Sequence, residues 1–302
     1  MNENILKELR SALLERVSLS NLPETVWERE GVINTWGTNA IEGNTLSLAE
    51  VETVLIEQKG VKDQTLHDIL EVKKHNEVFR DLLSLIPKRI DLVMVQELHE
   101  GLFEGIKPDA GQWRKSNVRI RGARHAPPRW EKVIPLMTEW EKEYDGREVG
   151  GEGTFELAAW MHYRFESIHP FADGNGRVGR LLLNLHFLKR NWPPVNVSPL
   201  NREEYLRALE IGNNGDLPAL RDFLRILMGQ SLLDLLDQVG TTKQDELRTM
   251  AEFAKKGTHS ARYLSIRAKQ NFIPAVKRMG EWMTSRRALD LYEMLVGRER
   301  SQ

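Results

Sequence analysis

The sequence contains no cysteine, which excludes disulfides, thiolate metal sites and a cysteine nucleophile. It also lacks an apolar run of the roughly 18 residues that span a membrane, so we expect no membrane contact. The N-terminus has neither the basic start nor the apolar stretch of a signal peptide. A formal net charge of −1 gives the whole chain no general affinity for nucleic acid or membranes. These absences favour a soluble cytoplasmic protein.

The most informative segment is residues 169–180, which read His-Pro-Phe-Ala-Asp-Gly-Asn-Gly-Arg-Val-Gly-Arg. Apolar residues recur at helical spacing before this segment and fill the stretch after it, so the Gly-Asn-Gly sequence falls where a loop becomes a helix. Free backbone N–H groups at a helix N-terminus favour anions. Arg177 and Arg180, one turn apart, would add charged donors on the same side. The segment therefore predicts a polyphosphate site.

Two side chains in this segment could carry chemistry. His169 is the only one that can accept a proton near neutral pH, and Asp173 offers the hard oxygen ligand that Mg²⁺ prefers. With a nucleotide on the loop, this set suits attack of a hydroxyl on phosphorus. The alternative is an ordinary turn between two core helices, with His169 capping one of them. The density of functional residue types argues against that alternative.

Residues 169–180 resemble the signature of the Fic family, His-Pro-Phe-x-[Asp/Glu]-Gly-Asn-[Gly/Lys]-Arg-x-x-Arg, at every defined position. Members of that family are all-helical enzymes that mostly transfer AMP from ATP to a Ser, Thr or Tyr hydroxyl of a target protein. The resemblance implies that His169 is the general base and that Asp173 is the Mg²⁺ ligand. It also implies a set of phosphate-binding residues, in which Arg180 holds the γ-phosphate: Gly174, Asn175, Gly176, Arg177 and Arg180.

A second motif, Thr-Asn-Ala-Ile-Glu-Gly-Asn at residues 38–44, ends near a glycine that is typical of a helix stop. Alone, it would be an exposed glutamate at a helix end. Beside the signature it resembles the family's inhibitory motif, [Ser/Thr]-x-x-x-Glu-[Gly/Asn], in the class with an N-terminal inhibitory helix. Glu42 would then compete with the γ-phosphate for the guanidinium of Arg180. In some relatives the equivalent glutamate instead helps to remove AMP from the target.

Between the two motifs, residues 111–128 break the helical pattern. Apolar and basic residues alternate over 118–121, which predicts a short β-hairpin, although a solvated ribbon without a site shows the same pattern. The segment resembles the Fic flap, which clamps an extended piece of the target by strand addition and borders the nucleotide. The flap residues implied are Val118, Arg119, Ile120 and Arg121.

Two residues beyond the signature also resemble family positions. Tyr205 begins a Tyr-x-x-Ala-Leu pattern, and Asn213 lies in the polar turn that follows it. The resemblance implies that they contact the adenine and the ribose. A tyrosine at helical spacing is also common in a protein core, and that alternative stays open.

The frequency of helix signals predicts an all-α protein in three parts. Residues 1–60 form an N-terminal helical region with the inhibitory motif, and residues 61–232 form the Fic catalytic core with its hairpin flap. Residues 241–302 form an appendage with an excess of Lys and Arg over Asp and Glu. This appendage loosely resembles the winged helix-turn-helix of excisionase-like DNA-binding proteins, which makes DNA one predicted partner. A helical appendage for dimerisation or target docking is the alternative.

The favoured function is a protein adenylyltransferase that uses ATP and Mg²⁺, modifies a target protein or itself, and is inhibited by Glu42. Alternatives within enzymes are transfer of UMP, phosphate or phosphocholine, and removal of AMP. From another class, the chain could be a DNA-binding regulator whose Fic domain senses nucleotide. The presence of both His169 and Asp173 argues against sensing alone, because binding does not require a base. Relatives also suggest that a homodimer controls the inhibitory helix.

Overall fold

The computed structural model describes residues 1–302 except 121–125, 213–214, 216, 241, 256 and 300–302. The described residues form two units, Trp27–Phe223 and a second made of Met1–Val26 with Leu224–Gln302. The boundaries fall within helices α2 (Glu24–Ile41) and α10 (Pro218–Val239). No helix in the described ranges is long and apolar enough to cross a membrane.

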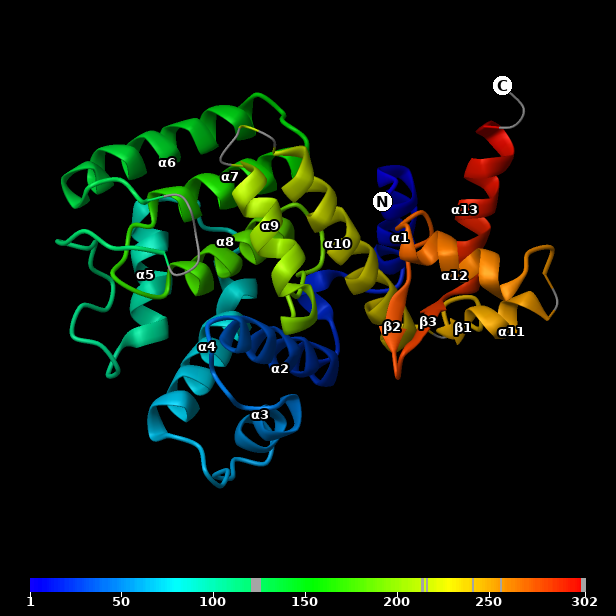
Figure 1. Cartoon of the computed structure of the whole chain (residues 1–302), viewed down its shortest axis with the longest axis horizontal. Helices are drawn as coiled ribbons and strands as arrows, with labels where there is room; N and C mark the ends of the chain where they lie inside the picture. The colour runs from blue at the N-terminus through cyan, green and yellow to red at the C-terminus, as the bar shows by residue number, and fades with distance from the viewer. Residues whose placement is uncertain (121–125, 213–214, 216, 241, 256, 300–302) are drawn as a thin grey trace. The chain divides into compact units, whose positions relative to one another are not determined.

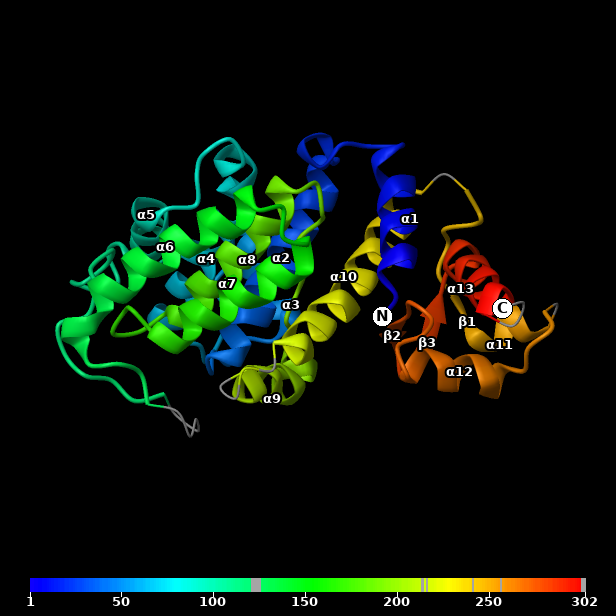
Figure 2. The same ribbon diagram turned by 90° about the horizontal axis from the view of Figure 1, so that it is seen from above.

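The Trp27–Phe223 unit is built around helix α8 (Asn175–Lys189). Nearly all of its residues are buried, as expected for a helix that is apolar around most of its circumference. It packs against α7, α4 and α5, and Figure 2 shows α6, α7 and α8 side by side. The other helices of this unit are α3 (Leu48–Leu55), α4 (Leu66–Leu85), α5 (Leu92–Phe103), α6 (Val133–Val149), α7 (Thr154–Ile168), α9 (Arg202–Gly212) and the 3₁₀ turns Trp130–Lys132 and Pro199–Asn201.

The second unit contains a small three-stranded sheet next to short helices (Figure 1). Its strand order is β1-β3-β2, and both pairings are antiparallel. Helices α11 and α12 form a helix-turn-helix, and β2 with β3 forms the hairpin that follows it. This order of helices and strands is compatible with the predicted winged helix-turn-helix, and the choice between DNA binding and docking stays a prediction. The elements are α1 (Glu3–Leu14), the 3₁₀ turn Leu19–Asn21, β1 (Arg248–Thr249), α11 (Met250–Ala254), α12 (Ala261–Lys269), β2 (Val276–Arg278), β3 (Glu281–Thr284) and α13 (Arg286–Glu299).

One sequence-based prediction, a domain boundary, differs from this architecture. The predicted boundary at residue 60 is wrong, because Val32, Val51 and Val54 share one hydrophobic cluster with Val72 of α4. This burial joins α2 and α3 to the core, whereas α1 belongs to the C-terminal unit. Of the predicted hairpin over 118–121, residues 118–120 contain no strand, and Arg121 lies outside the described residues.

The loop between α7 and α8 is held by hydrogen bonds from the Asn175 side chain and by packing of the Phe171 ring. Asn175 Oδ1 accepts from the N–H of Phe171 at 2.8 Å, and its Nδ2 donates to the Phe171 carbonyl at 3.0 Å. The buried Phe171 ring stacks on His99, with centroids 3.8 Å apart. Gly174 turns the chain into α8 with φ = 76°, a conformation that favours glycine. These contacts fix the loop before any ligand binds.

We predict that Gly174→Ala destabilises the protein more than Gly105→Ala. Both glycines have positive φ, 76° and 75°, so both variants carry backbone strain of about 1 kcal/mol or more. A Cβ at Gly174 would also lie 2.2 Å from Phe103 Cε2, whereas nothing lies within 4 Å of one at Gly105. Urea denaturation should show about 1–3 kcal/mol of extra destabilisation for Gly174→Ala. Equal midpoints for the two variants would contradict this packing.

Candidate active site

Arg180 and Glu42 meet at the centre of the Trp27–Phe223 unit. Arg180 Nη2 donates to Glu42 Oε1 at 2.6 Å, and its Nε donates to Thr38 Oγ1 at 2.6 Å. Nη2 also donates to the Thr38 carbonyl at 3.3 Å. Arg180 is buried on α8, and its two partners belong to the last turn of α2 and the residue after it. The predicted pairing of Glu42 with Arg180 is present.

The Glu42 carboxylate also lies against the glycine loop. A Cβ built on Gly176 would lie only 2.2 Å from Glu42 Oε1. Burial would raise the pKa of Glu42, but the charge of Arg180 and its hydrogen bond outweigh burial and hold that pKa below its ordinary value. Glu42 is therefore a carboxylate at neutral pH. It occupies the loop at which an anion was predicted to bind.

Arg177 is held by a second carboxylate that the motifs did not indicate. Its Nη1 lies 2.7 Å from Glu71 Oε1 on α4, and its guanidinium carbon lies 4.6 Å from the centre of the Phe103 ring. Nη1 also reaches Asn39 Oδ1 at 3.5 Å, and Nη2 lies 3.9 Å from Asp173 Oδ2. Glu71 stands at an ordinary helical position with no motif around it. Only its contact with Arg177 reveals its role.

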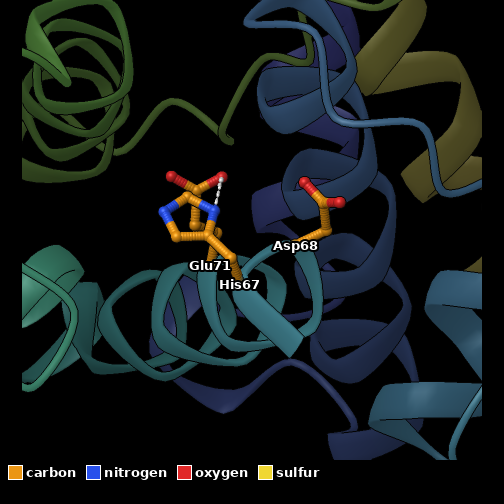
Figure 3. A group of neighbouring side chains, drawn as sticks. All are labelled: His67, Asp68 and Glu71. Carbon is orange, nitrogen blue, oxygen red and sulfur yellow. Dashed lines mark ion pairs between the residues drawn. The ribbon is translucent and has the colours of Figure 1, made fainter. Parts of the chain in front are cut away.

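Glu71 also belongs to a group that could in principle hold a metal ion. His67, Asp68 and Glu71 stand at the start of α4, with ligand atoms within 4.8 Å of one another (Figure 3). His67 Nδ1 lies 3.9 Å from Glu71 Oε2, and Asp68 Oδ2 accepts from Thr65 Oγ1 at 2.6 Å. Helix capping and the ion pair with Arg177 already account for the two carboxylates. Nothing further indicates a metal there.

Asp173 has the properties that a magnesium ligand needs. Its carboxylate is about half exposed, at 54%, and Lys107 Nζ lies 2.6 Å from Oδ2. Burial would raise the pKa of Asp173, but the hydrogen bond from Lys107 and the charge of Arg177 lower it below its ordinary value. A charged, accessible oxygen that already attracts a cation fits a Mg²⁺ ligand. Lys107 was not predicted, because it lies far from the signature in sequence.

His169 stands between the end of α7 and the loop, with left-handed backbone angles φ = 53° and ψ = 61°. Its side chain is partly buried. Burial lowers the pKa of His169 to about 4, against the opposing effect of a hydrogen bond to the Glu166 backbone, and the nearby charge of Arg114 adds a smaller lowering. The imidazole is therefore neutral at pH 7 and able to accept a proton.

The predicted nucleotide contact of Tyr205 is not supported by its position. Its side chain is buried, and its hydroxyl donates to His162 Nε2 at 2.7 Å. The other ring nitrogen of His162 donates to the Gly179 carbonyl at 3.0 Å, which fixes this tautomer. Tyr205 thus contacts α8 through His162, next to Arg180. Asn213 lies outside the described residues, and the side chains of Val118, Arg119 and Ile120 are partly or fully exposed on the flap segment.

Comparisons with known proteins agree with this architecture. A model of the Fic/DOC family matches residues 89–187. The protein adenylyltransferase Fic of Aedes aegypti is 29% identical over 227 residues, which cover 74% of this chain and 44% of that protein. The chain thus spans less than half the length of this relative.

Two solved structures are also similar. A Fic-domain signalling protein from Bacteroides thetaiotaomicron has a TM-score of 0.72 at 22% identity, covering 78% of this chain and 97% of that one. Fic-1 from C. elegans has a TM-score of 0.66 at 27% identity, covering 80% and 72%. The predicted all-α Fic fold is confirmed. The match to the Fic/DOC family model covers the helix before the signature loop, the loop itself and most of the helix after it.

Proposed function

We propose that this chain is a protein adenylyltransferase that transfers AMP from ATP to a Ser, Thr or Tyr hydroxyl and is restrained by Glu42. The observation that carries the proposal is the ion pair between Glu42 and Arg180. This pair lies next to Gly176, in the same signature segment that begins with the neutral imidazole of His169. The name of the mosquito relative, a protein adenylyltransferase, supports the same reaction.

The chemistry follows from the residues around the loop. The neutral His169 takes the proton of the target hydroxyl, and the oxygen forms a bond to the α-phosphorus of ATP. The bond from that phosphorus to the bridging oxygen breaks, and pyrophosphate leaves with the electron pair. The N–H groups at the start of α8, which no side chain caps, and the Arg177 guanidinium face the developing negative charge.

Asp173 is the residue that would hold Mg²⁺ in this reaction. Bound Mg²⁺ would neutralise charge on the phosphates of ATP. Lys107 Nζ donates to Asp173 Oδ2 at 2.6 Å and helps to hold this carboxylate in place. His99 contributes to the same end, because its Nε2 donates to the Asp173 carbonyl at 3.2 Å while its Nδ1 accepts from Gly111. The residues present therefore suit the ion.

Inhibition follows from competition for one guanidinium. Arg180 donates through Nε and Nη2 to Thr38 and Glu42. A γ-phosphate needs the same donors, because a guanidinium fork binds one planar or tetrahedral anion at a time. With Glu42 in place, ATP would lose this ligand and its α-phosphate would not align with the incoming hydroxyl. Residues 118–120 would then present the target backbone by strand addition once the restraint is removed.

We predict that Glu42→Gly raises transfer of AMP by about 10- to 100-fold, because a hydrogen bond between charged groups contributes about 1.5–3 kcal/mol. The measurement is incorporation of label into the chain itself or a lysate target from ATP labelled at the α-phosphate, in Mg²⁺. Parallel reactions use ATP labelled at the γ-phosphate, labelled UTP and labelled CDP-choline. Label from one of these alone would replace AMP by phosphate, UMP or phosphocholine.

The control is the double variant Glu42→Gly, Arg180→Ala. Its activity should fall back to the level of the unmodified chain, because the freed arginine is what the first change makes available. Strictly additive effects would mean that the two residues do not communicate. A Glu42→Gly variant that instead loses the ability to remove AMP from a labelled target would assign Glu42 to the reverse reaction.

We predict that His169→Ala, made in the Glu42→Gly background, lowers AMP transfer by about 10²- to 10⁴-fold. The affinity for ATP, measured by calorimetry, should stay within about twofold, because the base acts on the hydroxyl and makes no contact with the phosphate loop. Transfer that survives this change would remove His169 from the mechanism.

A second candidate activity, DNA binding, is favoured by one observation on the C-terminal unit. Its helix-turn-helix is followed by a hairpin, and the exposed residues Arg262, Ile266 and Lys269 form one stripe along α12. Lys277 on β2 is also exposed. Such a helix next to a basic hairpin suits the major groove and the flanking phosphates.

We predict that the full chain binds a short DNA duplex at low salt and that Arg262→Glu, Lys269→Glu and Lys277→Glu together abolish binding. Fluorescence anisotropy across a salt series should show a slope that the triple variant reduces by about 2–3, roughly 0.9 for each lost phosphate contact. The triple variant Lys59→Glu, Lys62→Glu, Lys73→Glu, at exposed positions in the other unit, is the charge-matched control. No binding by the intact chain would favour the docking alternative.

A further inference from the structure

Arg114 is a buried arginine whose partners are backbone carbonyls. Its side chain is 4% exposed, and no carboxylate lies among its hydrogen-bond partners in the part of the chain that the structure describes. Its Nε donates to the His169 carbonyl at 2.8 Å, and Nη2 reaches the Ile168 carbonyl at 3.5 Å. Nη1 donates to the Ser116 carbonyl at 2.9 Å, and Nη2 to that of Pro128 at 2.5 Å.

These carbonyls belong to two different parts of the site. Ile168 and His169 end helix α7, where the carbonyls lack helical partners and carry partial negative charge. Ser116 and Pro128 stand on either side of the flap segment, residues 117–127. One guanidinium therefore fastens both ends of the flap segment to the turn that carries His169. Because burying an unpaired charge is costly, this set of contacts is maintained only if all of the segments stay in place.

Neighbouring contacts reinforce the same connection. The Arg114 N–H donates to the Pro170 carbonyl at 3.0 Å, and the Trp113 ring stacks on Phe171 with centroids 4.9 Å apart. His169 itself has a positive φ, which costs about 1–3 kcal/mol for a residue other than glycine. Such a conformation persists only where the surroundings enforce it. The contacts from Arg114 and its neighbour supply that enforcement from outside the signature.

The guanidinium also acts on the imidazole through its charge. After burial, Arg114 is the next factor that lowers the pKa of His169, while the charges of Glu42 and Asp173 raise it. Those three charged side chains and the Glu166 backbone are the groups that influence the ring. The positive charge of Arg114 thus helps to set the pH below which the imidazole takes up a proton.

We propose that Arg114 is a positioning residue that holds the general base and the target-binding flap in one register, so that a hydroxyl presented by residues 118–120 meets His169. The proposal rests on the function proposed above. It separates two contributions of one side chain. The hydrogen bonds of the guanidinium hold the flap, which should govern the KM for the target. Its charge adds to the lowering of the His169 pKa, which should shift the pH dependence of transfer.

The test compares Arg114→Lys and Arg114→Gln in the Glu42→Gly background, with Lys115→Gln as the exposed neighbouring control. Lysine keeps the charge but cannot reach four carbonyls, so the KM for the target should rise about 10-fold or more with an unchanged pH profile. Glutamine should raise the KM similarly. It should also move the acid limb of the pH profile to higher pH, because loss of the Arg114 charge raises the pKa of His169, while burial still holds that pKa below its ordinary value. The parent and Lys115→Gln should stay flat from about pH 5.5 to 8.

Calorimetry on the same variants should show ATP affinity within about twofold of the parent, since none of the Arg114 contacts lies in residues 173–180. Two readouts do not require activity: the NMR titration of His169 and hydrogen exchange of residues 116–120. Exchange should become about 10-fold faster in both variants, while amides of α8 are unchanged. If the parent transfers no AMP, the proposed function fails, and these readouts still decide the role of Arg114. Unchanged flap exchange, or equal loss of ATP affinity and stability with an unmoved His169 titration, would overturn the proposal.

Discussion

The site depends on two positive charges that α8 places inside the protein. Arg177 and Arg180 are 4% and 5% exposed, on a helix whose other residues fill the core. A buried guanidinium without an anionic partner costs several kcal/mol, so the rest of the fold must bring carboxylates to both. Glu42, just after α2, pairs with Arg180, and Glu71 on α4 pairs with Arg177. This requirement explains why helices that precede the Fic/DOC match pack tightly with it.

The two carboxylates differ in how readily an anionic substrate could replace them. Glu71 is only 10% exposed and lies within the long helix α4. Glu42 is 37% exposed and lies just beyond the last turn of α2, beside a glycine with φ = 103°. A group at a helix end can move without unpacking the core, because terminal turns fray before central ones. The geometry thus favours a lasting ion pair between Arg177 and Glu71. It favours Arg180 as the arginine that could exchange its carboxylate partner for an anionic substrate.

The surroundings of His169 keep its side chain uncharged, whereas those of Asp173 keep its side chain charged. Both charge states suit the same proposed reaction. Burial with a nearby guanidinium keeps the imidazole uncharged, whereas Lys107 and Arg177 keep the carboxylate charged. A base must be neutral and a metal ligand must be ionised at the same pH. The protein achieves both by bringing the cation Lys107 from outside the signature and Arg114 from beside the flap. Neither residue has a local sequence pattern that marks it.

The sequence by itself determined the features that lie within one contiguous segment. The loop, the helix after it and the positions of His169, Asp173 and both arginines follow from local periodicity, glycine conformation and helix termini. The tertiary structure decided the pairings between segments distant in sequence. Glu71 reaches Arg177 across 106 positions and Arg114 reaches His169 across 55, and no local rule links such residues. The sequence left Tyr205 open between the nucleotide and the core for the same reason: helical spacing shows that a residue faces inward, but only packing shows its neighbours.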